Sequence, residues 1–163
     1  MASVSVTDGD LLTLLNAGTI QVLAHQVNCQ GVMGAGLARQ VRAAYPAAYH
    51  DYRQALRSGD LRLGGVRVTP VGPLRFIAHL AGQAGFGRDR PHTDYAALRS
   101  ALEALAAWHR EFAETVIGLP YGIGCGLGGG EWAVVADLIA ATLPTARVVR
   151  LGPAPRLGPR PGR

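Results

Sequence analysis

Two adjoining stretches near the start of the chain decide its fold: Ile20–Val27 reads IQVLAHQV, and Asn28–Gly36 reads NCQGVMGAG. The first stretch is mostly apolar over eight residues, which predicts a buried strand. The three glycines of the second stretch allow positive φ and a close approach of the backbone to a ligand. Leu37 and Val41 then lie four residues apart, on one face of a predicted helix. Strand, glycine loop and helix in this order predict one unit of an α/β sheet.

A second glycine loop, Gly122–Gly130, follows the predicted strand 116–119 and precedes the predicted helix 131–143. Ordering a segment so rich in glycine costs much conformational entropy, so we expect it to have a function. A diphosphate lying between the two glycine loops would supply that function, because both loops offer backbone N–H groups. Neither loop is a dinucleotide fingerprint, which follows the first strand of its fold and has an acid about 20 residues further on.

The remaining pattern alternates short apolar strands with amphipathic helices. This predicts an α/β/α sandwich around a mixed, mostly parallel sheet, with ligands bound outside the carboxyl ends of the strands. The other predicted strands are 4–6, 64–69, 75–80 and 147–151, and the other predicted helices are 11–15, 36–44, 47–57 and 94–112.

Composition excludes several chemistries. All 16 basic residues are Arg and none is Lys, so the chain has no Walker-A phosphate loop and no lysine nucleophile. Cys29 and Cys125 make no disulfide framework and lack the spacing of a zinc site. We predict no metal and no cofactor. With 163 residues, 48% of them hydrophobic and 17% charged, the chain suits one globular domain.

The net charge of +5 is concentrated at the C-terminus, where residues 152–163 carry three Arg and no acid. We predict a domain over 1–151 and a disordered Gly/Pro/Arg-rich tail over 152–163, which could meet a polyanion or only aid solubility. The sequence has no apolar run of about 18 residues and no signal-peptide pattern. We therefore expect a cytoplasmic monomer with no membrane partner.

Three segments together resemble the macrodomain family: Gly9-Asp10-Leu11, the run from His25 to Ala38, and Pro120–Leu127 followed by Trp132. The likeness extends over about residues 4–151. It is strongest to the branch that contains the terminal ADP-ribose protein glycohydrolase and the antitoxins that reverse ADP-ribosylation of DNA. The resemblance implies a three-layer sandwich that binds ADP-ribose, with ADP-ribosylated DNA or protein as its partner.

The resemblance also implies site residues. Asp10 would accept a hydrogen bond from the adenine amino group beside the Leu11 backbone, and Asn28 would hold the distal ribose. The diphosphate would lie between two backbone walls, and four more residues would complete the ADP-ribose site. The first wall is Gly34, Ala35, Gly36 and Leu37, the second is Gly124, Cys125, Gly126 and Leu127, and the four others are Gln26, Val27, Met33 and Ile123. Asp10 could instead be only a helix cap, and Asn28 only a turn residue.

The sequence departs from this branch at two positions. Gln83 stands where the branch often has a lysine nucleophile, and Gly128 stands where an acid can follow the Gly-Cys-Gly-Leu run. A lysine adduct is therefore excluded, and hydrolysis must use water at the oxocarbenium-like anomeric carbon. We predict that Gln83 positions this water through its amide.

Four side chains are candidate acids or bases, and each also fits a structural role. Asp94 and Glu131 suit the N-termini of helices. His79 suits a core histidine, and His25, three residues before Asn28, is expected to point to the opposite face of the sheet.

The loop 84–93 offers Phe86 for stacking and Arg88 and Arg90 for phosphates, a combination that suits single-stranded nucleic acid or an ordinary polar loop. The leading hypothesis is an ADP-ribosyl hydrolase acting on thymidine-linked DNA or on carboxylate esters of protein. The alternatives are an ADP-ribose reader without activity and a phosphatase for ADP-ribose 1″-phosphate.

Overall fold

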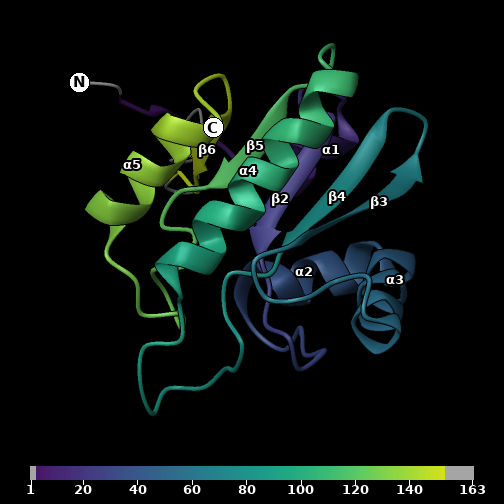
Figure 1. Ribbon diagram of the computed structural model, residues 1–163. Helices are drawn as coiled ribbons and strands as arrows, with labels where there is room; N and C mark the ends of the chain where they lie inside the picture. The colour runs from purple at the N-terminus through teal and green to yellow at the C-terminus, as the bar shows by residue number, and fades with distance from the viewer. Residues whose placement is uncertain (1–2, 153–163) are drawn as a thin grey trace, which may run out of the picture.

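The computed structural model describes residues 3–152, which form one six-stranded sheet between two layers of helices (Figure 1). The elements in chain order are β1 Ser5–Asp8, α1 Leu11–Asn16, β2 Val22–Gln26, α2 Gly36–Ala44, α3 Pro46–Ser58, β3 Val66–Gly72, β4 Arg75–Leu80, α4 Tyr95–Glu111, β5 Ile117–Pro120, α5 Trp132–Thr142 and β6 Arg147–Arg150. The strand order is β1-β6-β5-β2-β4-β3, and only the β3–β4 pair is antiparallel. The predicted fold class is confirmed.

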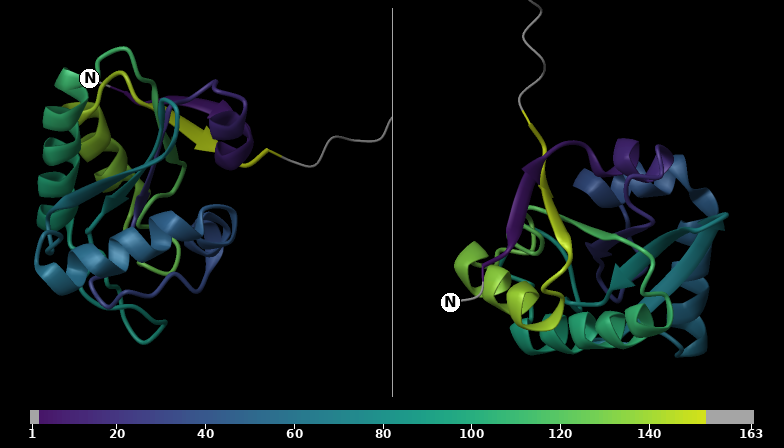
Figure 2. Two further views of the ribbon diagram at one scale, coloured as in Figure 1. Left: turned by 90° about the vertical axis from the view of Figure 1, so that its right-hand side faces the viewer. Right: turned by 90° about the horizontal axis from the view of Figure 1, so that it is seen from above.

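Alternating residues of the central strands supply two apolar cores. Val22 and Ala24 of β2 pack with α4 and α5, whereas Leu23 packs with α1 and with Val41 of α2 on the other face. Helices α4 and α5 therefore cover one face of the sheet, and α1, α2 and α3 cover the other (Figure 2). Within residues 3–152, no helix is long and apolar enough to cross a membrane.

Several element boundaries differ from those predicted. Strand β2 is shorter at both ends than the predicted 20–27, and β3 continues to Gly72 instead of ending at Thr69. Pro70 lies within β3 because β3 is an edge strand, where a residue that lacks an N–H is tolerated. Most of the predicted tail, residues 153–163, lies outside the described residues.

The sheet order places the two glycine loops together. Strands β2 and β5 are parallel neighbours, so their carboxyl ends meet at one edge of the sheet. The loop after β2 leads to α2 on one face, and the loop after β5 leads to α5 on the other. A ligand at this edge would lie between the two loops.

Asp94 caps the longest helix, as the sequence predicted. Its Oδ1 accepts a hydrogen bond of 3.0 Å from the backbone N–H of Ala97. We expect Asp94→Ala to lower the free energy of unfolding by about 1 kcal/mol in urea denaturation, because the helix loses its cap. The control Asp137→Ala removes an exposed carboxylate from within α5 and should change it by less than about 0.5 kcal/mol. Equal losses in the two variants would contradict the capping role.

Candidate ADP-ribose site

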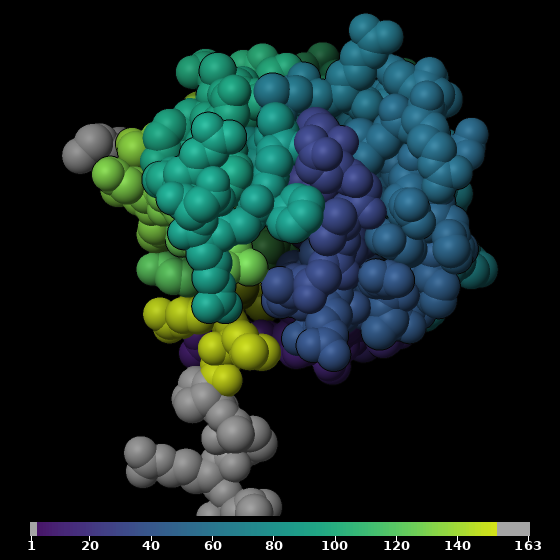
Figure 3. Space-filling view, turned by 90° about the horizontal axis from the view of Figure 1, so that it is seen from below, coloured from purple at the N-terminus to yellow at the C-terminus, as the bar shows by residue number. Residues whose placement is uncertain are grey.

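A cavity of about 590 Å³ lies at the carboxyl ends of β2 and β5, between the two glycine loops. Seen from below, the loop after β2 (purple) lies between the segment 81–94 (teal) and the α2–α3 region (blue) (Figure 3). The lining residues are His25, Gln26, Val27, Asn28, Val32, Gly34, Ala35, Gly36, Leu37, Ala38, Gln83, Phe86, Gly87, Arg88, Pro120, Tyr121, Gly122, Ile123, Gly124, Gly126, Leu127 and Gly128.

Most of the predicted site residues line this one cavity. Five do not: Asp10, Leu11, Met33, Arg90 and Cys125. Asp10 is the N-cap of α1, with its Oδ1 accepting from the Thr13 N–H at 2.9 Å, so the alternative cap role is present. Leu11 and Met33 are buried in apolar clusters, and Cys125 packs against the core. Contacts of these residues with adenine or diphosphate stay predictions.

Asn28 holds the loop that follows β2. Its Oδ1 accepts from the backbone N–H groups of Gln30 at 3.0 Å and Val32 at 3.3 Å, and its Nδ2 donates to the Val32 carbonyl at 2.8 Å. Burial raises the pKa of Tyr52, so its hydroxyl stays protonated and donates to the Asn28 carbonyl at 2.5 Å. Asn28 is thus the turn residue that the sequence allowed, and its contact with ribose stays a prediction.

The Gln26 side chain joins three loops at the cavity floor. Its Nε2 donates to Gln83 Oε1 at 2.6 Å and to Thr93 Oγ1 at 2.9 Å, and Thr93 Oγ1 donates to the Gly124 carbonyl at 2.6 Å. Gln26 lies at the end of β2, between the ends of β4 and β5, from which the other two loops start. Its buried Oε1 has no hydrogen-bond partner among the described residues.

Gln83 lines the cavity, and its predicted role in positioning water stays a prediction. Its amide already makes two hydrogen bonds. Its Oε1 accepts from Gln26, and its Nε2 donates to the Gly85 carbonyl at 2.7 Å. Each end of an amide can make a second hydrogen bond, so one position remains at each end for a ligand or a water.

Gly128, the position of the missing loop acid, has no room for a side chain. A Cβ there would lie 2.4 Å from Thr93 Oγ1 and 2.7 Å from the Gly124 carbonyl oxygen. The Gly128 carbonyl also accepts from the N–H groups of His92 and Thr93 at 2.8 and 2.9 Å. The loop is packed around glycine at this point, so the sequence difference from the branch is built into the local structure.

His25 also lines the cavity. The prediction that it points to the opposite face of the sheet from Asn28 is wrong, because His25 bonds to His79 and Asn28 bonds to Tyr52, whose ring lies 5.4 Å from that of His79. The two-residue alternation of a strand ends with β2 at Gln26, and the chain then turns, which brings Asn28 to the cavity that His25 also faces. Val32, Ala38 and Tyr121 also line the cavity. They lie within the segments that carry the family resemblance, but the sequence assigned them no individual role.

A buried hydrogen-bonded chain fixes the protonation of His25. Arg67 binds Asp51 at 2.8 and 2.9 Å and holds its pKa below the usual range, so the carboxylate accepts from Thr69 Oγ1 at 2.5 Å. Thr69 then accepts from His79 Nε2 at 3.3 Å, which leaves His79 Nδ1 to accept from His25 Nε2 at 2.9 Å. Because the Asp51 carboxylate can only accept, each group along the chain must donate towards it. His25 therefore carries its proton on Nε2, and its Nδ1 is an acceptor with no partner among the described residues.

Burial lowers the pKa of His25 to about 4 and that of His79 well below its usual range. Both rings are therefore neutral at pH 7, and His25 Nδ1 is a buried acceptor with no hydrogen-bond partner among the described residues. His79 is the core histidine that the sequence allowed, and Asp94 and Glu131 lie outside the lining. Glu131 precedes α5 without a capping hydrogen bond from its side chain.

The cysteines give no sign of nucleophilic chemistry. Burial raises the pKa of both the Cys29 and the Cys125 thiols, which reduces the thiolate fraction. Within residues 3–152, no three His, Cys, Asp or Glu side chains are grouped as metal ligands.

Residues 24–139 match the macro domain family, which is 116 of the 163 residues. The chain belongs to this family. It is 31% identical over 128 residues to the DNA ADP-ribosyl glycohydrolase of Mycobacterium tuberculosis, and 31% identical over 127 residues to that of Thermus aquaticus. These alignments cover 78% and 76% of the chain but only 36% and 34% of the relatives.

Solved structures agree with the family. The macrodomain of Mycobacterium tuberculosis DarG superimposes with a TM-score of 0.75 at 26% identity, over 94% of this chain and all of that one. Thermosipho africanus DarTG in complex with ADP-ribose shares the fold at 22% identity and a TM-score of 0.77, over 99% of this chain and 44% of that one.

The lack of space for a side chain at Gly128 can be tested directly. We expect Gly128→Ala to lower the melting temperature by several degrees, because the added Cβ meets Thr93 Oγ1 and the Gly124 carbonyl. Gly126→Ala is the matched control, since a Cβ at Gly126 has no neighbour within 4 Å. Equal melting temperatures for the two variants would show that the loop is not packed around Gly128.

The two neutral histidines predict a loss of stability in acid. The unfolded chain binds a proton at His25 below pH 6.5, whereas the folded protein binds it only near pH 4. Stability therefore falls as pH drops from 6.5 towards 4, and His25 alone should cost about 2 kcal/mol between pH 7 and 5. Urea denaturation at the two pH values measures this loss. A wild-type free energy of unfolding that does not change would contradict the neutral, buried assignment.

Proposed function

We propose that this macrodomain is an ADP-ribosyl hydrolase that releases ADP-ribose from DNA or protein by attack of water. The cavity carries this proposal. Both of its long walls are glycine-rich backbone, which suits a diphosphate, and a neutral histidine and a glutamine amide lie in the same lining. The distant relation to proteins named DNA ADP-ribosyl glycohydrolase supports it.

In the proposed reaction, water attacks the anomeric carbon of the distal ribose, and the bond from that carbon to the thymine base or the carboxylate breaks. The charge that develops on the ribose is oxocarbenium-like. Gln83 orients the water through its free amide positions. His25 Nδ1 is buried and has no partner among the described residues, so the proton of the attacking water passes to it through a second water. The departing group leaves with the bonding electrons and takes up a proton from solvent.

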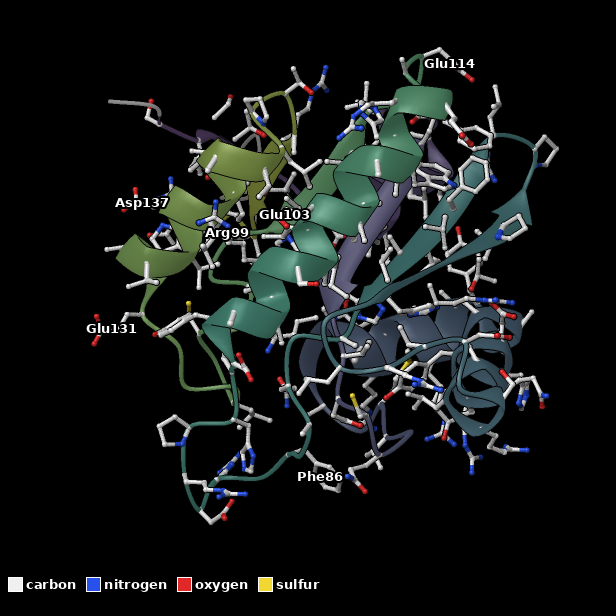
Figure 4. The ribbon with its side chains drawn as sticks, viewed as in Figure 1. Phe86, Arg99, Glu103, Glu114, Glu131 and Asp137 are labelled. Carbon is white, nitrogen blue, oxygen red and sulfur yellow. The ribbon has the colours of Figure 1, made fainter. Side chains whose placement is uncertain are left out.

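Three features favour modified DNA over modified protein as substrate. Phe86 is 52% exposed at the cavity and is free to stack on a base (Figure 4). Arg88 lines the same mouth and is exposed, so it can meet a phosphate. The relatives are named DNA ADP-ribosyl glycohydrolases. Because this chain spans only about a third of their length, DNA as the substrate of this chain is a proposal.

A second candidate is a reader that binds ADP-ribose without hydrolysing it. Two features favour this function: the chain has no Lys, and Gly128 has no space for a side chain. The lysine nucleophile and the loop acid found in the resembled branch are therefore both missing. The two functions differ in turnover and agree in binding.

The deciding experiment is release of ADP-ribose from a thymidine-linked oligonucleotide and from a glutamate-linked protein. We expect release by the wild type, and His25→Asn should lower kcat by about 100-fold while the Kd for free ADP-ribose stays within about threefold. Gln83→Ala should lower kcat in the same direction. The melting temperature of each variant serves as the folding control.

If the wild type binds ADP-ribose but releases none from either substrate, the protein is a reader and the roles of His25 and Gln83 are wrong. Asn28→Ala then reports on the ribose end of the site, because it should weaken binding in either case. Faster release from the protein than from the oligonucleotide would overturn the preference for DNA.

A further inference from the structure

A second hollow lies beside the ADP-ribose cavity, between helices α2 and α3. Its volume is about 480 Å³, and it is lined by Met33, Gly34, Arg39, Arg42, Ala43, Pro46, Tyr49 and His50. Gly34 lines both hollows, so they adjoin at the loop that follows β2. We call this second hollow the α2–α3 groove.

Two guanidinium groups lie over the ring of Tyr49, and one of them, that of Arg42, belongs to the groove lining. The Arg42 guanidinium carbon lies 4.3 Å from the centroid of the Tyr49 ring, and that of Arg53 lies 5.6 Å from it. The Tyr49 hydroxyl donates to the Gly31 carbonyl at 3.4 Å, which ties the ring to the loop of the cavity. Arginines stacked in this way keep their N–H donors free for an anion.

Among the described residues, neither the two arginines that line the groove nor the neighbouring Arg53 has an acidic partner. Within the described chain, Arg39, Arg42 and Arg53 form no ion pair, and all three are exposed. The one acid in residues 29–58 is Asp51, and Arg67 already binds it at 2.8 Å. With four Arg and one acid, this segment has a net charge of +3.

The opposite helix layer carries the opposite charge. Residues 94–146 contain six acids and two Arg, a net charge of −4. Figure 4 shows several of the acids, among them Glu103 and Asp137, on α4 and α5, away from the groove. A polyanion approaching the cavity is therefore attracted towards the α2–α3 side and repelled from the α4–α5 side.

We propose that the α2–α3 groove binds backbone phosphates of a single-stranded nucleic acid whose modified nucleotide delivers its ADP-ribosyl group to the adjacent cavity. This inference rests on the proposed function and names the surface that would select the substrate. Phe86 and Arg88 line the cavity from the segment 81–94, and Arg39 and Arg42 line the adjacent groove from α2. An exposed aromatic ring and several arginines at two adjacent hollows suit a single strand, whose bases stack and whose phosphates pair with arginine.

The test uses the full chain and a fluorescent single-stranded 12-mer of thymidine, unmodified, with anisotropy measured at several salt concentrations. We expect the double variant Arg39→Ala/Arg42→Ala to weaken binding at least about tenfold. It should also flatten the plot of log K against log salt by about 1.4, from two lost phosphate contacts on a single strand. The Kd for free ADP-ribose should not change, because neither arginine lines the cavity.

The matched control is Arg99→Ala/Arg110→Ala, which removes the same charge from α4 in the acidic layer. It should bind the 12-mer within about threefold of wild type, since charges further than a Debye length are screened. If both double variants bind the 12-mer equally weakly, net charge alone explains the loss and the groove proposal is overturned. Unchanged binding by Arg39→Ala/Arg42→Ala would overturn it as well.

Two further outcomes separate this inference from the proposed function. If no substrate is hydrolysed but binding of the 12-mer still depends on Arg39 and Arg42, the hydrolase proposal fails and the groove stands. If the groove variant loses release of ADP-ribose from a glutamate-linked protein while its binding of the 12-mer is unchanged, the partner is an acidic protein and the nucleic-acid assignment is overturned.

Discussion

The candidate site depends on the hydrogen bonds of one amide, the side chain of Gln26 at the end of the central strand β2. Its Nε2 bonds to Gln83 and Thr93, and Thr93 bonds to Gly124. The loops after β2, β4 and β5 are thereby joined at one point. Three glycines leave the space for this amide, since a Cβ at Gly82, Gly124 or Gly128 would come within 3.2 Å of it. Glycine in these loops serves close packing as well as access to a ligand.

The same strand also connects the cavity to the far side of the sheet. His25 and His79 are direct neighbours in the β2–β4 register, so their rings can bond to each other in the core. Asp51 and Thr69 complete the chain from the α3 and β3 side. A charged, half-buried carboxylate thus determines which nitrogen of the buried His25 is left as an acceptor, and within residues 3–152 no acid lines the cavity itself.

Charge is distributed by layer in this macrodomain. The basic helices α2 and α3 adjoin the cavity through the loop that contains Gly34, and the acidic helices α4 and α5 cover the other face. The resembled branch often has a lysine nucleophile and can have a loop acid, and this chain has neither at those positions. Its cationic groups are arginines: Arg88 lines the cavity, and Arg39 and Arg42 line the adjacent groove. This arrangement suits the recognition of a large anionic substrate more than covalent chemistry.

The sequence by itself determined the order of strands and helices, the position of both glycine loops at one sheet edge, and the absence of a lysine nucleophile, because these follow from local periodicity, glycine content and composition. Only the tertiary structure decided that His25 faces the cavity, since the chain turns after Gln26. The closure at Gly128 depends on Thr93, which lies 35 residues earlier and meets it only after the loops pack. Arg42 and Arg53 likewise come from separate helices and meet at Tyr49 because α2 and α3 fold against each other, a contact that no local pattern encodes.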